Sequence, residues 1–175
     1  QTESFGYTEG EGYQAVELPY DGCELSMVIF LPEAGQFQAF EKELQAQQAD
    51  AIISDLRNTL VALTMPRFEF HSAFSLKDTL AGVGMPIAFS GGADFSGMTG
   101  NRELFISDVL HKAFVSVDEA GTEAAAATAV GMVGSAGPEP PVPVEVTIDR
   151  PFIFLIRDID TGAILFVGRV LNPTA

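Results

Sequence analysis

A few side chains in this sequence are of the types that a hydrolase uses for nucleophilic catalysis. Ser135 or Cys23 could serve as nucleophile, His111 as base and Asp108 as the group that orients the base. The serine, however, is not in a Gly-x-Ser-x-Gly turn that would expose its hydroxyl. Asp108 and His111 lie three residues apart in a strand-like segment, so they would point to opposite faces. We therefore expect no enzyme and no catalytic residues.

Metal and cofactor chemistry has even less support. His71 and His111 are the only histidines, and neither belongs to a His, Cys, Asp and Glu spacing that is typical of a metal site. The carboxylates are numerous but form no recognisable acid–base pair. We interpret His111 as structural and His71 as surface or structural, and we expect no metal and no cofactor.

The segment "GTEAAAATAVGMVGSAGPEPPVPV", from Gly121 to Val144, is unusually long for a connection in a compact domain. Its alanine tract has two interpretations, a flexible or helical linker and a loop that can become a buried strand. No proline interrupts Thr122 to Gly137, so every backbone N–H there can join a sheet. No charge occurs between Glu123 and Glu139. The prolines that follow then stiffen the far side in extended geometry. These features favour the second interpretation.

Strands are the main elements expected to hold this segment. Alternation and turn residues predict strands over residues 13–20, 24–31, 59–70, 104–119, 142–148, 151–158 and 163–170. Helical spacing predicts short helices over residues 36–47, 49–57 and 75–81. Pro66 interrupts the third strand, which indicates a bulge or a strand that passes from one sheet to another. This order predicts an α+β fold with largely antiparallel sheets.

The strand predicted over residues 104–119 is apolar on both faces. His111, Ala113, Val115 and Val117 share one face, while Leu110 and Phe114 lie on the other. Such a strand needs partners on both sides in a large sheet, and the sequence offers few candidates. We therefore expect part of the fold to be missing from this chain.

Composition narrows the class of partner. The 175 residues are 47% hydrophobic, which suits one globular domain. The net charge of −15, from 24 acidic and 9 basic residues, argues against a nucleic-acid partner. No apolar stretch is long enough to predict a membrane span. Cys23 is the only cysteine, so cysteine usage does not decide the compartment.

Four segments together resemble the serpins, a family of serine-protease inhibitors. They are "LPYDGCELSMVIFLP", residues 80–98, "ISDVLHKAFVSVDEAGTEAAAATAV" and "RPFIFLIRDIDTGAILFVGRVLNPTA", and they occur in serpin order. The resemblance covers residues 1–175 and identifies them with the carboxyl-terminal half of one serpin domain. It implies an incomplete multi-sheet serpin fold with an exposed reactive loop over residues 119–143. The resemblance further implies that the amino-terminal helices and the first three strands of the central sheet are missing from this chain.

The resemblance implies inhibition of serine proteases by a suicide-substrate mechanism in the full-length parent. In this family a protease cuts the loop, and the cut loop inserts into the central sheet as a new strand. The matching hinge residues are Gly121, Thr122, Glu123, Ala124, Ala125, Ala126, Ala127 and Thr128. Two alternatives remain, a non-inhibitory serpin that acts as a carrier or folding module and an inactive structural fragment.

Family spacing from Gly121 places the reactive bond at Ser135–Ala136. Counting backward from the "RPF" segment gives Pro140–Pro141 instead, a bond that proteases rarely cut. A small residue at Ser135 suits a target serine protease of the elastase or subtilisin type.

The resemblance also implies an ion pair between Arg67 and Glu119 at the breach, where the loop begins to enter the sheet, and a shutter role for His111. No heparin site is evident. We expect an extracellular or periplasmic protein, with the cytoplasm left open.

Overall fold

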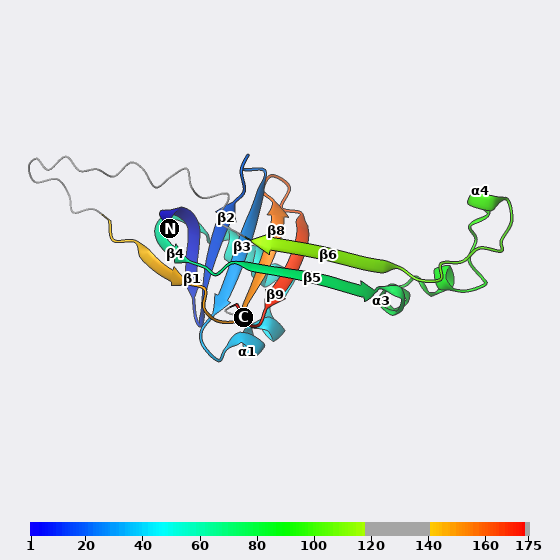
Figure 1. Ribbon diagram of the computed structural model, residues 1–175, viewed down its shortest axis with the longest axis horizontal. Coiled ribbons are helices and arrows are strands. Elements are labelled where there is room, and N and C mark those ends of the chain that lie inside the picture. The colour runs from blue at the N-terminus through cyan, green and yellow to red at the C-terminus, as the bar shows by residue number, and fades with distance from the viewer. Residues whose placement is uncertain (118–140, 174–175) are drawn as a thin grey trace, which may run out of the picture. The chain divides into compact units, whose positions relative to one another are not determined.

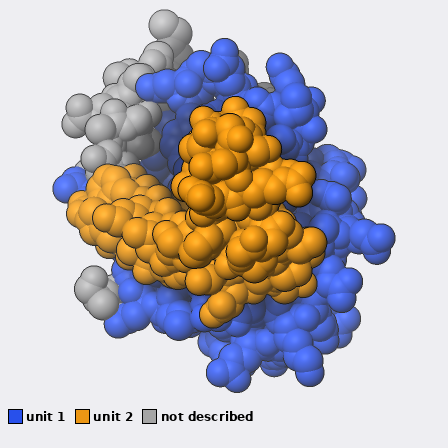
Figure 2. Space-filling model, turned by 90° about the vertical axis from the view of Figure 1, so that its right-hand side faces the viewer, with its two compact units in different colours: residues 1–67, 118–175 blue, residues 68–117 orange. Residues whose placement is uncertain are grey.

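The computed structural model describes residues 1–117 and 141–173. The chain divides into two compact units, one formed by residues 1–67 and 118–175 and the other by residues 68–117 (Figure 2). The fold class predicted from the sequence is confirmed, since strands dominate both units and most of them pair antiparallel.

Unit 1 is built on a seven-stranded sheet in the order β7-β4-β1-β2-β3-β8-β9 (Figure 1). All neighbours are antiparallel except β4 and β7, which are parallel. The strands are β1 (Thr2–Gly10), β2 (Tyr13–Pro19), β3 (Leu25–Pro32), β4 (Arg57–Thr64), β7 (Val144–Thr147), β8 (Phe152–Asp158) and β9 (Ile164–Val170).

Strand β1 joins the two parts of the sheet. Its first part, Thr2 to Tyr7, pairs with β4, and its second part, Gly6 to Gly10, pairs with β2. The chain between Thr147 and Phe152 can reach at most about 18 Å. In a flat sheet of this order β7 and β8 would lie about 24 Å apart. The sheet must therefore curve strongly between these two strands.

Two helices, α1 (Phe37–Glu43) and α2 (Ala46–Ser54), cover one face of the sheet and confirm the two helices predicted there. Phe37, Phe40 and Ile52 are buried from the helix side. The sheet side of the same cluster consists of Ala15, Val28, Phe30, Ile153 and Leu155. Because these residues alternate along β2, β3 and β8, one face of each strand belongs to this core.

Unit 2 is a two-stranded antiparallel ribbon with a helical extension. β5 (Phe68–Ser75) pairs with β6 (Leu110–Val117), and between them lie α3 (Lys77–Gly82), η1 (Pro86–Phe89) and α4 (Ser96–Thr99). The strand predicted over residues 59–70 is thus divided around Pro66, with β4 and β5 in different sheets. Of the two interpretations of Pro66, a bulge or a crossing between sheets, the structure supports the crossing.

The strand predicted over residues 104–119 is shorter in the structure. Leu104 to Val109 are not in a strand, and the backbone N–H of Ile106 donates to Ala88 O at 2.9 Å. Residues 118 and 119 lie outside the described part.

Candidate functional site

The proposed loop lies mostly outside the described residues. Glu119, the hinge from Gly121 to Thr128, and the Ser135–Ala136 bond all belong to residues 118–140, which the structure does not describe. What it does describe is the strand on each side. β6 leads into the segment and ends at Val117, and β7 follows it from Val144.

Strand β6 has one paired edge within the described residues. It pairs with β5 from Leu110 to Val117, and no other described strand lies beside it. Large apolar side chains remain exposed on this ribbon, with Leu110 at 72%, Phe114 at 54% and Phe74 at 50% of their accessible surface. An exposed apolar strand with an open edge can accept a further strand. This agrees with the expectation that β6 needs more partners than the described residues provide.

His111 lies opposite Phe74 in the ribbon, and the two rings are 5.2 Å apart. His71 stacks on Phe114 with ring centroids 4.6 Å apart. The carboxylate of Asp108 accepts hydrogen bonds from the Ser75 hydroxyl and from the backbone N–H of Val109. The structure thus gives Asp108 a different partner from the one that a catalytic triad requires. The shutter role of His111 remains a prediction.

Arg67 lies just before β5 and is exposed. Its predicted partner, Glu119, is outside the described residues, so the breach pair also remains a prediction.

Strand β7 holds the far end of the loop. Val146 and Ile148 are fully buried, and the backbone N–H of Ile148 donates to Thr64 O at 2.8 Å. Just beyond them, the guanidinium of Arg150 donates from Nε to Pro32 O at 2.8 Å. The loop therefore returns to a firmly packed part of unit 1.

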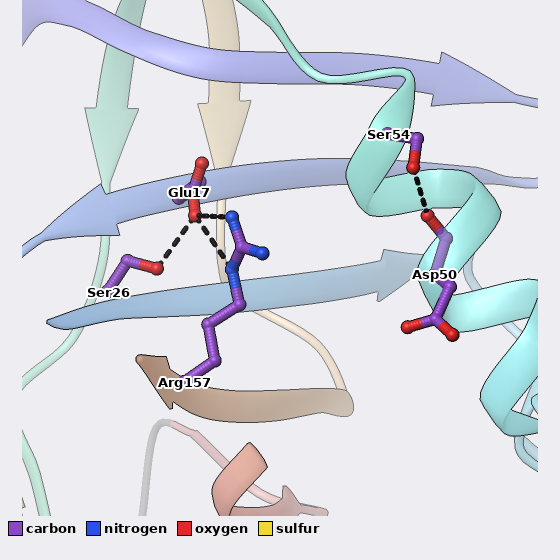
Figure 3. Close-up of polar contacts among 5 residues, drawn as sticks. All are labelled: Glu17, Ser26, Asp50, Ser54 and Arg157. Atoms are coloured by element: carbon purple, nitrogen blue, oxygen red, sulfur yellow. Dashed lines mark hydrogen bonds and ion pairs between the residues drawn. The ribbon is translucent and has the colours of Figure 1, made fainter. Parts of the chain in front are cut away.

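A polar cluster that the sequence analysis missed joins β2, β3 and β8 (Figure 3). Glu17 Oε1 accepts hydrogen bonds from Arg157 Nε at 3.1 Å, Arg157 Nη2 at 2.8 Å and Ser26 Oγ at 2.7 Å. The two charged side chains are only 18% and 16% exposed, and Ser26 is fully buried. The sequence offered one signal for this cluster, since Glu17 and Arg157 are charged residues within largely apolar strands. The cluster ties the segment after the loop to the segment before it.

At the end of β8, Asp158 organises the turn into β9. Its carboxylate accepts hydrogen bonds from the Thr161 hydroxyl at 2.6 Å and the Thr161 backbone N–H at 2.8 Å. These bonds stabilise the ionised form and lower the pKa of Asp158 below its usual value.

Within the described residues, no group of three or more His, Cys, Asp and Glu side chains is placed to hold a metal ion. Among the same residues, no helix has the length and apolar character needed to cross a membrane.

Comparison with known proteins gives a consistent result. The family model "Serpin (serine protease inhibitor)" matches residues 1–173. An uncharacterized serpin-like protein of Thermococcus kodakarensis is 44% identical over 99% of this chain and 40% of its own length. The leukocyte elastase inhibitor of Xenopus laevis is 42% identical over 97% of this chain and 45% of its own length.

The solved structure of thyroxine-binding globulin in complex with thyroxine superposes with a TM-score of 0.80 at 30% identity. The matched region covers 100% of this chain and 46% of the globulin chain. The chain thus spans less than half the length of these relatives.

Proposed function

Since this chain belongs to the serpin family, we propose that it is the carboxyl-terminal part of an inhibitor of serine proteases that acts by loop insertion. The observation that carries the proposal is the hinge sequence from Gly121 to Thr128. It contains small side chains, no proline and a single charge, so it can enter a sheet without a large packing cost.

The first chemical step is ordinary proteolysis. The hydroxyl of the protease serine attacks the carbonyl carbon of Ser135, the bond to Ala136 N breaks, and Ala136 leaves as a free amine. The carbonyl carbon of Ser135 is then joined to the protease serine by an ester bond. The same enzyme would normally complete the reaction by hydrolysing this ester with water.

Insertion of the cut loop competes with that hydrolysis. The segment up to Ser135 can pair with the open edge of β6, whose two apolar faces suit the middle of a larger sheet. A new strand of about a dozen residues, at about 1 kcal/mol net for each hydrogen bond, would contribute on the order of 10 kcal/mol. The free energy released by insertion can move the attached protease away from its first position and distort its active site. The ester then persists because the distorted enzyme cannot hydrolyse it.

The residue before the cut suggests the target. Ser135 is small and uncharged, which suits the shallow specificity pocket of an elastase-type or subtilisin-type protease and disfavours enzymes that need arginine or lysine. The name of the Xenopus laevis relative, a leukocyte elastase inhibitor, supports this choice.

A non-inhibitory carrier is the second candidate, favoured by the similarity to thyroxine-binding globulin. Incubating the full-length protein with a panel of serine proteases separates the two functions. An inhibitor gives a complex that survives SDS, whereas a carrier gives only the cleaved loop. Cleavage without such a complex across the panel would contradict the proposal.

The breach pair gives a separate prediction. If Arg67 and Glu119 form an ion pair that holds the gap shut, Glu119→Lys replaces an attraction with a repulsion. The full-length variant should then polymerise faster on mild heating, as followed by native gel electrophoresis. Glu139→Lys is the control, because it makes the same charge change on the far side of the reactive bond. Equal polymerisation rates in the two variants would reject the pair.

A further inference from the structure

The far base of the loop is a strand with few hydrogen bonds of its own. β7 has four residues, Val144–Thr147, and lies at the edge of the sheet with β4 as its described neighbour. The pairing is parallel, which is slightly less stable per residue than antiparallel pairing. Any pull on the loop acts directly on this strand, so contacts beyond the β4 pairing decide whether it stays in place.

Arg150 supplies such contacts. Its Nε donates to the carbonyl oxygen of Pro32 at 2.8 Å, and its Nη1 donates to the carbonyl oxygen of Thr147 at 3.3 Å and to Asp149 Oδ1 at 3.2 Å. The side chain is 26% exposed. Pro32 is the last residue of β3 and Thr147 is the last residue of β7.

These two strands are not neighbours in the sheet. β4, β1 and β2 lie between them, and only the curvature of the sheet brings their ends within reach of one guanidinium. Arg150 thus closes the curved sheet at the point where the chain crosses from β7 to β8. A planar guanidinium offers several N–H donors in a fixed fork, which a lysine ammonium on its flexible stem does not reproduce.

We propose that Arg150 is a positioning residue that fastens β7 to the end of β3 and so keeps the far base of the reactive loop anchored. Its consequence for inhibition rests on the proposed function. A loop whose far end is fixed in a sheet has fewer conformations open to it than a loop whose far end is free. If β7 left the sheet, more conformations would become available to the loop, and the protease would meet the reactive bond in the productive one less often.

The first test measures β7 directly and does not depend on inhibition. Amide hydrogen exchange is compared in the full-length wild type, Arg150→Gln, Arg150→Lys and Arg169→Gln. The last is the matched control, because Arg169 also bonds across to the segment before the loop, to Glu41 Oε1 at 2.6 Å, but from β9.

Loss of the charged hydrogen bonds should make the amide of Ile148, which donates to Thr64 O, and the β7 amides that bond to β4 exchange roughly ten- to a hundredfold faster in Arg150→Gln. The exchange rates in Arg150→Lys should lie between those of Arg150→Gln and the wild type. If Arg150→Gln does not fold, the comparison of Arg150→Lys with the wild type tests the proposal. Exchange in β7 should be unchanged in Arg169→Gln. Equal β7 exchange in the wild type and Arg150→Lys, or in Arg150→Gln and Arg169→Gln, would overturn the assignment.

The second test measures inhibition. The number of inhibitor molecules consumed for each protease molecule inactivated should rise several-fold in Arg150→Gln and stay at the wild-type value in Arg169→Gln. A purely structural role would change both variants in proportion to their loss of global stability. If the wild type forms no protease complex, the proposed function fails while the exchange result still decides the role of Arg150. If the complex forms with equal stoichiometry in both variants, the link between Arg150 and the loop fails.

Discussion

Ala124→Arg in the full-length protein should convert an inhibitor into a substrate. In the proposed mechanism Ala124 belongs to the hinge, which enters the sheet first, and insertion would carry an arginine into a packed layer without a counter-ion. An unpaired buried charge costs several kcal/mol. If that cost is felt in the rate-limiting step, insertion slows by about a hundredfold or more. Hydrolysis of the ester would then finish before insertion begins.

This outcome is read on an SDS gel after incubation with an elastase-type protease. We expect cleaved Ala124→Arg protein, little or no stable complex and a fully active protease. Glu139→Arg introduces the same residue beyond the proposed reactive bond, in the part of the loop that the proposed mechanism leaves out of the sheet, and should still form the complex. Wild-type levels of complex in Ala124→Arg would show that the hinge does not enter a sheet.

Glu17→Leu should lower the free energy of unfolding of the full-length protein by about 3–5 kcal/mol. The substitution leaves the guanidinium of Arg157, which is only 16% exposed, without its carboxylate partner. It also removes the acceptor of the buried Ser26 hydroxyl. Denaturant unfolding followed by circular dichroism measures the change.

The double variant Glu17→Leu, Arg157→Leu tests whether the two residues act as a pair. Removing both charges avoids a lone buried ion, so the double variant should be more stable than Glu17→Leu alone. Arg102→Leu is a control, because its ion pair with Asp94 is largely exposed, and it should change stability by about 1 kcal/mol or less. Additive losses in the double variant would contradict the coupling.

Much of the fold followed from local signals. Alternation and turn residues identified most strands, and Pro66 marked the crossing between sheets correctly. β1 was missed, although Phe5 and Tyr7 alternate with polar residues along it. Gly6 lies between them and lowers the strand preference. Its presence has a tertiary reason, since a Cβ at Gly6 would lie 3.2 Å from Glu17 Cβ on the neighbouring strand.

The site was predictable only in part. The hinge stays a prediction from a local pattern, because residues 121–128 lie outside the described part. The length of β6 could not be predicted, because the backbone N–H of Ile106 bonds to Ala88 in η1 rather than continuing the strand. The Glu17–Arg157 pair joins residues 140 positions apart. Such a pair depends on strand order and register, which no short stretch of sequence specifies.

The central claim is that a protease cuts Ser135–Ala136 and remains attached because the hinge inserts. The most direct measurement is the mass of the small fragment released when the SDS-stable complex of the full-length protein with an elastase-type protease is denatured. The account predicts a fragment that begins at Ala136. A fragment that begins at Val133 or Pro141 would contradict the assigned bond, and the absence of any SDS-stable complex would contradict the mechanism itself.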